Sequence, residues 1–306
     1  MEIKPTQIKW DQIPKDWMVQ PKYDGECNKL IIKKLHWTKN DGVASLQRFE
    51  GRNKTDFYPE IIEGLTGQVF QADMVLVGEV CVLMNELVAS FPHIQLRMNT
   101  QNKVKQKLAM KDKLVTFMAF DIEEYDGKNL DKVPYGERYS IMQQALKQKV
   151  TWKDGQPSAR IMPVKNISLD GWVDQLDSPI DYTWKEFVKE HEMEGIVVKN
   201  PDKAAEQVKL KNWDEDDFKI IGTETTEAGE ARGWFISKLR LEDTKGTHVN
   251  KGQQFDCKYI NYPQTKQAKK DVIGKTAIIK YMKMRGRDGQ YLAPRHPSLV
   301  EILEFK

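Results

Sequence analysis

Residues 22–25 read Lys22-Tyr23-Asp24-Gly25, and they stand between two apolar runs, Trp17-Met18-Val19 and Leu30-Ile31-Ile32. Apolar runs on either side of a glycine-containing tetrapeptide predict two strands joined by a tight, exposed turn. A lysine on such a turn can act as a nucleophile once its amine has lost a proton. Asp24 can orient the amine or a metal ion, and Gly25 allows a bulky ligand to approach the backbone. A solvated lysine beside a turn is the alternative, so the interpretation depends on the rest of the chain.

The composition is that of a globular protein with room for two domains of ordinary size. The chain has 306 residues, of which 30% are charged and 40% hydrophobic, with a formal net charge of +3. The 3 cysteines stand far apart without a Cys-x-x-Cys pair, which argues against disulfides and a zinc site and for a reducing compartment. No apolar signal region or membrane-length run is present, so we expect a cytoplasmic protein with no membrane partner.

Hydrophobic patterning predicts an α+β fold for the first two thirds of the chain. The predicted strands are residues 28–38 and 43–50, joined by an Asn-Asp-Gly turn, and residues 74–84, 114–122, 195–199 and 207–211. Helices are predicted to start near residue 58 and to span residues 100–113, 135–149 and 183–192.

The composition changes after residue 211. Residues 214–217 are Asp-Glu-Asp-Asp, which predicts an exposed acidic linker. Strand-like segments follow at 218–225, 232–242, 252–258, 275–284 and 289–294, with one lysine-rich helix at 263–272. Five short strands and a helix predict a small OB-fold β-barrel. We therefore expect one domain over residues 1–212 and a second over residues 213–306.

Isolated ionisable residues stand inside apolar strands: Glu79, Glu194, Lys199, Lys209 and Lys211. For any one strand, a solvated face is the ordinary explanation. A whole set of such strands instead indicates a polar cleft. Its lysines would bind phosphate and would favour the neutral form of Lys22 by like-charge repulsion. Its glutamates would hold a divalent cation, magnesium, that bridges phosphates. The combination suits a lysine that attacks phosphorus.

The order of these segments resembles that of the ATP-dependent DNA ligases of the covalent nucleotidyltransferase superfamily, in their small two-domain phage or bacterial form. Lys22-Tyr23-Asp24-Gly25 is similar to the nucleophile motif, and Gly51-Arg52-Asn53 with Tyr58-Pro59-Glu60-Ile61 resembles the motif that follows. Further likenesses, in family order, are residues 76–80, residues 117–121 followed by residues 125–128, residues 194–199 and residues 207–211. Six short motifs in order make the resemblance specific.

The resemblance implies an adenylation domain, a nucleotidyltransferase with an ATP-grasp-like build of antiparallel sheets and helices, followed by an OB-fold domain. Lys22 would attack ATP, release pyrophosphate and carry AMP, which would pass to the 5′-phosphate of a nick before the 3′-hydroxyl attacks. Gln20 and Pro21 would bind the nucleotide, Phe120 would stack on adenine, and Arg52 and Glu79 would contact the ribose or the nick. Glu79 and Glu194 would bind Mg²⁺. Lys199, Lys209 and Lys211 would contact the phosphates.

Three positions depart from the family pattern. Cys27 stands where an arginine is usual, and Lys29 is a possible replacement; the thiol itself is either oxidation-sensitive or buried and inert. Gln20 stands where glutamate is common, yet its amide oxygen can still accept a hydrogen bond from the amino group of adenine. Gly51 stands in place of a serine.

The implied partner is nicked double-stranded DNA, bound by a monomer in a bacterial or phage-infected cytoplasm. Candidate DNA contacts, for which solvated surface charge is the alternative, are Arg52, Lys103, Lys105, Lys107, Arg285, Arg287 and Arg295. Two other classes stay open: a sister enzyme, either an RNA ligase or an mRNA-capping guanylyltransferase, and a catalytically inactive nucleic-acid-binding module.

Overall fold

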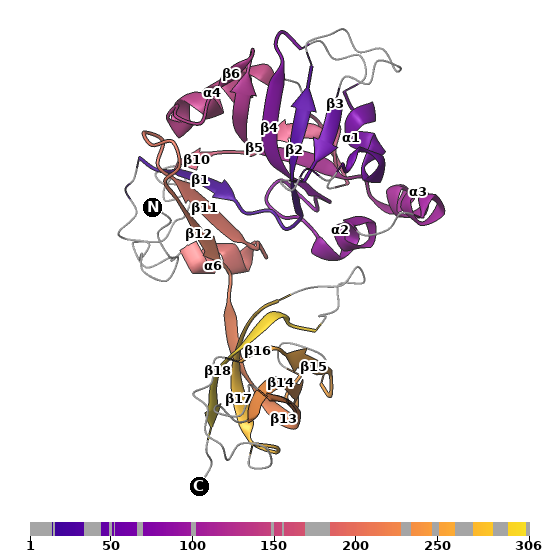
Figure 1. Ribbon diagram of the computed structural model, residues 1–306, viewed down its shortest axis with the longest axis vertical. Coiled ribbons are helices and arrows are strands. Elements are labelled where there is room, and N and C mark those ends of the chain that lie inside the picture. Colours follow the sequence, from indigo (N-terminus) through magenta and orange to yellow (C-terminus); the bar gives the residue numbers. More distant parts are fainter. Residues whose placement is uncertain are drawn as a thin grey trace. The chain divides into compact units, whose positions relative to one another are not determined.

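The chain folds into two compact units, Met1–Asn212 and Trp213–Lys306, both built mainly from β-sheet with few helices (Figure 1). The computed structural model describes residues 14, 16–33, 44–48, 51, 53–65, 70–98, 102–147, 150–154, 156–168, 184–227, 234–246, 251–260, 272–283 and 293–303. None of the helices in this described part has the length and hydrophobicity that a membrane span requires.

A five-stranded sheet forms the centre of the first unit. Its order is β3 (Ala44–Gln47), β2 (Glu26–Ile32), β4 (Met74–Cys81), β5 (Thr116–Tyr125) and β6 (Lys128–Asn129), and β9 (Ile161–Pro163) runs parallel to β5. Every second residue of β2 is buried, which matches the alternation of side chains across a strand. One face of the sheet packs on α1 (Pro59–Glu63), α2 (Phe91–Met98) and α4 (Tyr135–Ala145) through a single apolar core.

The strand that follows the nucleophile candidate is β2 of the first sheet, and the strand that precedes it belongs to a second, antiparallel sheet. Its order is β10 (Ile167–Ser168), β1 (Met18–Pro21), β11 (Gly195–Lys199) and β12 (Gln207–Lys211). Val188 of α6 (Trp184–Glu190) packs against buried residues of β1, β11 and β12 and covers their apolar face. Because Val208 and Leu210 are buried on this face, Lys209 and Lys211 project from the other, as the alternation predicts.

Four short elements complete the described first unit. They are the 3₁₀ turn η2 (Thr55–Phe57), the lysine-rich α3 (Lys103–Asp112), and the small hairpin of β7 (Trp152–Lys153) and β8 (Gln156–Pro157). The start of α1 at Pro59 and the helical form of residues 103–112 agree with the predictions from the sequence.

The second unit is one curled, six-stranded sheet. Its order is β15 (Gln254–Cys257), β14 (Trp234–Glu242), β13 (Asp214–Glu227), β17 (Thr276–Met282), β18 (Arg295–Leu303) and β16 (Tyr259–Ile260). The curl brings β15 next to β18 and β16 next to β14, so the two ends of the sheet lie close together. Its core includes Phe218, whose ring meets the rings of Phe255 and Tyr281 edge-on.

One prediction for this unit was wrong. The acidic run is not a linker, because β13 begins at Asp214 and pairs with β17, and the hydroxyl of Tyr281 donates to Asp216 over 2.7 Å. Strand pairing and this hydrogen bond override the poor strand propensity of aspartate. Of the predicted last strand, residues 289–292 lie outside the described residues, and the strand that the structure shows here is β18, which begins at Arg295. The Asn-Asp-Gly turn and residues 263–271 of the predicted helix lie outside the described residues.

A buried ion pair ties three segments of the first unit together. The guanidinium of Arg97 donates to both carboxylate oxygens of Glu60 and, over 2.8 Å, to the carbonyl oxygen of Phe57. The carboxylate of Glu60 also accepts from the backbone N–H of Val115 over 3.1 Å. Arg97 is 1% exposed and Glu60 is 4% exposed, so both charges lie in the core. Removing one partner there leaves the other charge buried and unpaired, which lowers the stability of the fold strongly.

Replacing Arg97 with leucine is expected to lower the free energy of unfolding by about 3–5 kcal/mol, because it leaves the Glu60 carboxylate buried without its cation. Urea denaturation of the purified variant measures this. The matched control is Lys33→Ala, which removes one partner of the exposed ion pair between Lys33 and Asp73 and is expected to cost less than ~1 kcal/mol. Equal losses in the two variants would contradict the structural importance of the buried pair.

Candidate functional site

Lys22 lies directly beyond β1, beside the turn that opens β11. Its backbone N–H donates to the carbonyl oxygen of Gly195 over 2.9 Å, and its ammonium donates to a carboxylate oxygen of Glu194 over 2.6 Å. The Glu194 side chain is 6% exposed and that of Lys22 is 21% exposed. The amine is therefore reachable from solvent, while the carboxylate beneath it is not.

Gly195 makes this approach possible. Its φ is +156°, and a β-carbon at this position would lie 2.1 Å from the carbonyl oxygen of Leu210. Only glycine tolerates both the conformation and the contact with β12. The absent side chain therefore places Glu194 at the strand end next to Lys22.

Gly25 has a similar role on the other side of the nucleophile loop. A β-carbon here would lie 2.3 Å from the carbonyl oxygen of Val80 and 2.9 Å from the Cγ atom of Glu79. The structure thus shows that the glycine makes room for strand β4, and the approach of a ligand at this position stays a prediction. The tight contact brings β4, and with it Glu79, up to the loop that carries Lys22.

Glu79 is the acidic residue in the middle of β4, opposite Cys27 of β2. Burial raises the pKa of its carboxyl to about 8; Lys22 opposes this shift, and the nearby carboxylates of Glu194 and Asp24 add to it. Three carboxylates thus lie close enough to Lys22 or to one another to interact electrostatically. Within the described residues, however, no set of three His, Cys, Asp or Glu side chains has the arrangement of a complete metal site.

The thiol of Cys27 lies between the two sheets. Burial, with a smaller contribution from Glu79, raises its pKa to about 12, although Lys209, Lys22 and Arg48 act in the opposite direction. A thiol with such a pKa is protonated near neutral pH and is a poor nucleophile, which favours the inert alternative for this half-buried cysteine. Lys29, the suggested replacement for the missing arginine, pairs with Glu123 of β5 over 2.5 Å.

The two lysines of β12 follow the register of the second sheet. Lys211 is paired with Gly195, the residue that contacts Lys22, and Lys209 is paired with Val197, whose other neighbour is Gln20 of β1. Lys209 also acts on the pKa values of Cys27 and Lys199. The strand pairing therefore brings both lysines to the same side of the sheet as Gln20.

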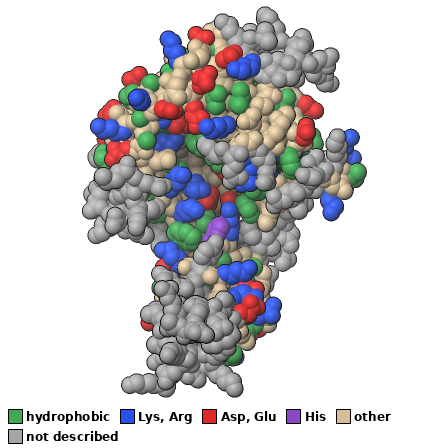
Figure 2. Space-filling view, in the orientation of Figure 1, with side chains coloured by type: hydrophobic (Ala, Val, Ile, Leu, Met, Phe, Trp, Pro, Cys, Tyr) green, Lys and Arg blue, Asp and Glu red, His purple; other side chains and the backbone are tan. Residues whose placement is uncertain are grey.

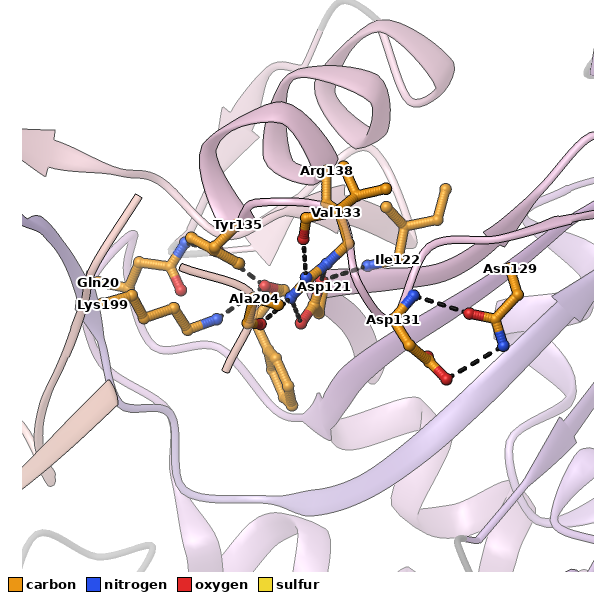
Figure 3. A network of polar contacts seen from close by, with 11 residues as sticks. Gln20, Asp121, Ile122, Asn129, Asp131, Val133, Tyr135, Arg138, Lys199 and Ala204 are labelled. Atoms are coloured by element: carbon orange, nitrogen blue, oxygen red, sulfur yellow. Dashed lines mark hydrogen bonds and ion pairs between the residues drawn. The ribbon is translucent and has the colours of Figure 1, made fainter. Parts of the chain in front are cut away.

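A buried polar network connects Gln20 to β5 and α4 (Figure 3). The Gln20 amide donates to the hydroxyl of Tyr135 over 2.7 Å, and this hydroxyl donates to the carbonyl oxygen of Phe120 over 2.8 Å. The ammonium of Lys199 donates to the same carbonyl over 2.9 Å and lies 4.0 Å from the centre of the Tyr135 ring. Next to it, Arg138 holds both carboxylate oxygens of Asp121, each over 2.8 Å.

Lys199 is 5% exposed, and burial lowers its pKa to about 7, although the nearby Asp121 favours the charged form. Its hydrogen bond goes to the backbone at Phe120, so its expected contact with phosphates stays a prediction. Tyr135, Asp121 and Arg138 were not among the predicted site residues. Tyr135 and Arg138 belong to a helix without a recognisable motif, and only the tertiary fold brings them next to Gln20.

The remaining predicted site residues are placed as follows. Pro21 ends β1, and Arg295 begins β18 in the second unit. Lys105 and Lys107 are exposed on α3. This helix also contains Lys103, but the side chain of Lys103 lies outside the described part of the chain. Arg52, Arg285 and Arg287 lie entirely outside the described residues. On the face in Figure 2, basic and acidic side chains of the described residues are interspersed, in keeping with the small net charge.

Comparison with known families settles the class of the first unit. The family model described as "ATP dependent DNA ligase domain" matches residues 4–213. The chain belongs to this ligase family. The family match covers all the residues of the site around Lys22 described above.

Two curated relatives of this ligase-family chain are much longer proteins. "Bifunctional non-homologous end joining protein LigD" of Bacillus subtilis is 25% identical over 218 residues, which are 69% of this chain and 33% of the relative. "DNA ligase 2" of Korarchaeum cryptofilum is 27% identical over 192 residues, 63% of this chain and 29% of the relative. The chain thus spans about a third or less of the length of these relatives.

A solved structure shares the fold over the whole chain. The structure titled "DNA binding with a minimal scaffold: Structure-function analysis of Lig E DNA ligases" superposes with a TM-score of 0.59 at 15% sequence identity. The match covers 99% of this ligase-family chain and 98% of that one. At this identity, the likeness concerns the arrangement of the backbone.

Gly25→Ala is expected to destabilise this ligase-family protein by about 1–3 kcal/mol, because the new methyl group overlaps the backbone of β4. The free energy of unfolding in urea measures the effect. Gly222→Ala is the matched control, since its β-carbon would find only an ordinary 3.5 Å contact with Arg240. If Gly25→Ala were as stable as the control, the glycine would not be required for the approach of β4.

Glu79→Gln is expected to stabilise the protein at pH 9 and to leave its stability at pH 5 nearly unchanged. The folded-state pKa of about 8 exceeds the ordinary value of 4.5, so the folded form binds the proton more tightly. Stability from this group is therefore complete below about pH 4.5 and is lost as pH rises through 8. A glutamine at this position stays neutral at every pH, so its contribution to stability does not fall as the pH rises. Urea unfolding at both pH values tests this, and an equal effect at the two values would refute it.

Proposed function

We propose that this chain is an ATP-dependent DNA ligase that seals nicks between a 5′-phosphate and a 3′-hydroxyl through an AMP adduct on Lys22. The observation that carries the proposal is the 2.6 Å contact between the Lys22 ammonium and Glu194, at the meeting point of β1 and β11. Family membership supports ATP as the nucleotide and DNA as the substrate.

Lys22 and Glu194 supply the nucleophile and the proton acceptor of the first chemical step. The carboxylate lies within hydrogen-bonding distance of the ammonium, so it can accept a proton and hold the amine in place. The amine nitrogen then forms a bond to the α-phosphorus of ATP, and the bond from that phosphorus to the pyrophosphate oxygen breaks. An oxygen of the 5′-phosphate of the nick then attacks the AMP phosphorus, and the bond from that phosphorus to Lys22 breaks. Finally, the 3′-hydroxyl attacks the 5′-phosphate and AMP leaves.

The strand register suits the binding of a nucleotide along the second sheet. Lys211 lies beside Gly195, close to Lys22, where the phosphates would bind. Lys209 and Gln20 lie farther along the sheet, opposite Val197. We assign the phosphates to Lys209 and Lys211, and the base to Gln20, Pro21 and Phe120. Fixed cations stabilise the charge that develops on phosphoryl oxygens during transfer.

Magnesium fits the carboxylates around Lys22. Mg²⁺ is commonly held by one or two carboxylates together with substrate phosphates rather than by a full protein cage, so Glu79 and Glu194 are sufficient donors. Burial and the nearby carboxylate of Glu194 both favour the neutral form of Glu79. A cation between the two carboxylates would offset their repulsion and favour the charged form. When bound, the cation would neutralise phosphate charge.

The second unit would serve the DNA. We assign Trp213–Lys306 to an OB-fold domain, since a curled sheet with its ends close together suits such a barrel. Contacts to the DNA backbone are assigned to Arg52, Lys103, Lys105, Lys107, Arg285, Arg287 and Arg295. We propose that the enzyme acts as a monomer in the cytoplasm, in DNA repair, replication or recombination.

Incubation with ATP and Mg²⁺ is expected to add one AMP to the protein, and Lys22→Ala is expected to abolish the adduct because it removes the amine that lies against Glu194. Intact mass spectrometry measures it. Lys165→Ala removes a lysine that is 64% exposed and is the control that should keep the adduct. Absence of any adduct in the wild-type protein would identify a binding module instead of an enzyme.

Two further measurements separate the sister enzymes. A guanylyltransferase would form the adduct with GTP in preference to ATP. An RNA ligase would seal a nick with RNA on both sides of the break better than a nick in duplex DNA. The proposal requires ATP and the DNA nick to be preferred.

A further inference from the structure

The hydroxyl of Tyr135 occupies a position where its hydrogen-bond roles are forced. The carbonyl oxygen of Phe120, 2.8 Å away, has no proton, so the hydroxyl must donate its single proton there. The hydroxyl can then only accept from Gln20, which lies 2.7 Å away on its other side. The atom of Gln20 that faces Tyr135 is therefore the amide nitrogen.

This assignment fixes the other end of the amide. The nitrogen and the oxygen of a primary amide lie on opposite sides of one carbon atom, so the Gln20 oxygen points away from the tyrosine. An amide oxygen is a hydrogen-bond acceptor. The direction of the Gln20 amide is thus set by Tyr135, a residue 115 positions later in the chain.

The surrounding contacts hold this arrangement in place. Gln20 is 2% exposed and Tyr135 is 3% exposed, so water does not replace a lost partner easily. Lys199 donates to the same Phe120 carbonyl and packs over the Tyr135 ring, which keeps the tyrosine from turning. One turn along α4, Arg138 anchors the helix to Asp121 of β5.

We propose that Tyr135 is a specificity-determining positioning residue: by accepting from the Gln20 amide nitrogen, it leaves the Gln20 oxygen as the group that meets the nucleotide base. An acceptor at this place binds a purine with an amino group at position 6, which donates. It repels a purine with a carbonyl at position 6, which is itself an acceptor. This inference rests on the proposed function, since it assigns the base to Gln20.

Tyr135→Phe tests the proposal, because it removes the hydroxyl and keeps the ring. Without the hydroxyl, the Gln20 amide is free to turn and present its nitrogen to a 6-oxo purine. The ratio of adduct formation with ATP to that with GTP, measured as kcat/KM by intact mass, is expected to fall about tenfold or more, on the scale of one correctly oriented hydrogen bond in a buried site.

The matched control is Tyr139→Phe. Tyr139 lies one turn farther along α4, is 3% exposed, and donates its hydroxyl to the carbonyl oxygen of Val164 over 2.7 Å. It has the same chemistry and burial but no contact with Gln20. We expect this variant to keep the wild-type ratio of ATP to GTP.

A second variant distinguishes orientation from general damage to the fold. Gln20→Glu combined with Tyr135→Phe replaces the amide with a carboxylate, which has acceptors on both sides and cannot be turned the wrong way. This double variant is expected to regain the preference for ATP. Recovery of the preference supports the proposal, and a Tyr135→Phe variant with the wild-type ratio overturns it.

Equilibrium binding separates this inference from the proposed function. Calorimetric titration with AMP and GMP needs no chemical step. If the wild-type protein forms no adduct but binds AMP over GMP and loses that preference in Tyr135→Phe, the ligase proposal fails and the role of Tyr135 stands. If adducts form normally and the preference is unchanged in the variant, the role of Tyr135 fails and the ligase proposal stands.

Discussion

The ion pair between Lys22 and Glu194 depends on the absence of side chains at two glycines. Gly25 and Gly195 each face a backbone carbonyl at a distance that no β-carbon tolerates. The first lets β4 reach the loop of Lys22, and the second lets β11 and β12 close on the same point. Because neither glycine has a β-carbon, the strands approach closely enough to bring the Lys22 amine and the nearby carboxylates together.

That convergence has an electrostatic cost, which is visible in the surrounding groups. Burial raises the pKa of Glu79 and lowers that of Lys199, so each is shifted towards its neutral form in the folded protein. Groups with such shifts gather where a protein binds charged ligands, because the ligand supplies the missing partner. The proposed ligand, ATP with Mg²⁺, would supply both signs of charge to these groups.

The network around Tyr135 has a different character from the cleft. Its hydrogen bonds are made within the protein: Asp121 and Arg138 pair with each other, and Lys199 donates to the Phe120 carbonyl. Such a network fixes the direction of its members rather than attracting charge. The fold therefore places this internally hydrogen-bonded network beside the carboxylates that gather around Lys22.

Local sequence determined most strands, the helices at residues 59, 103, 135 and 184, and the shared face of Lys209 and Lys211, because these follow from periodicity over a few residues. Order of motifs also determined the ligase family. Only the tertiary structure decided the role of Gly25, the strand character of Asp214–Asp217, the buried pair of Arg97 and Glu60, and the meeting of Tyr135 with Gln20. These depend on contacts between residues far apart in the chain, and a local pattern carries no information about which distant backbone will approach.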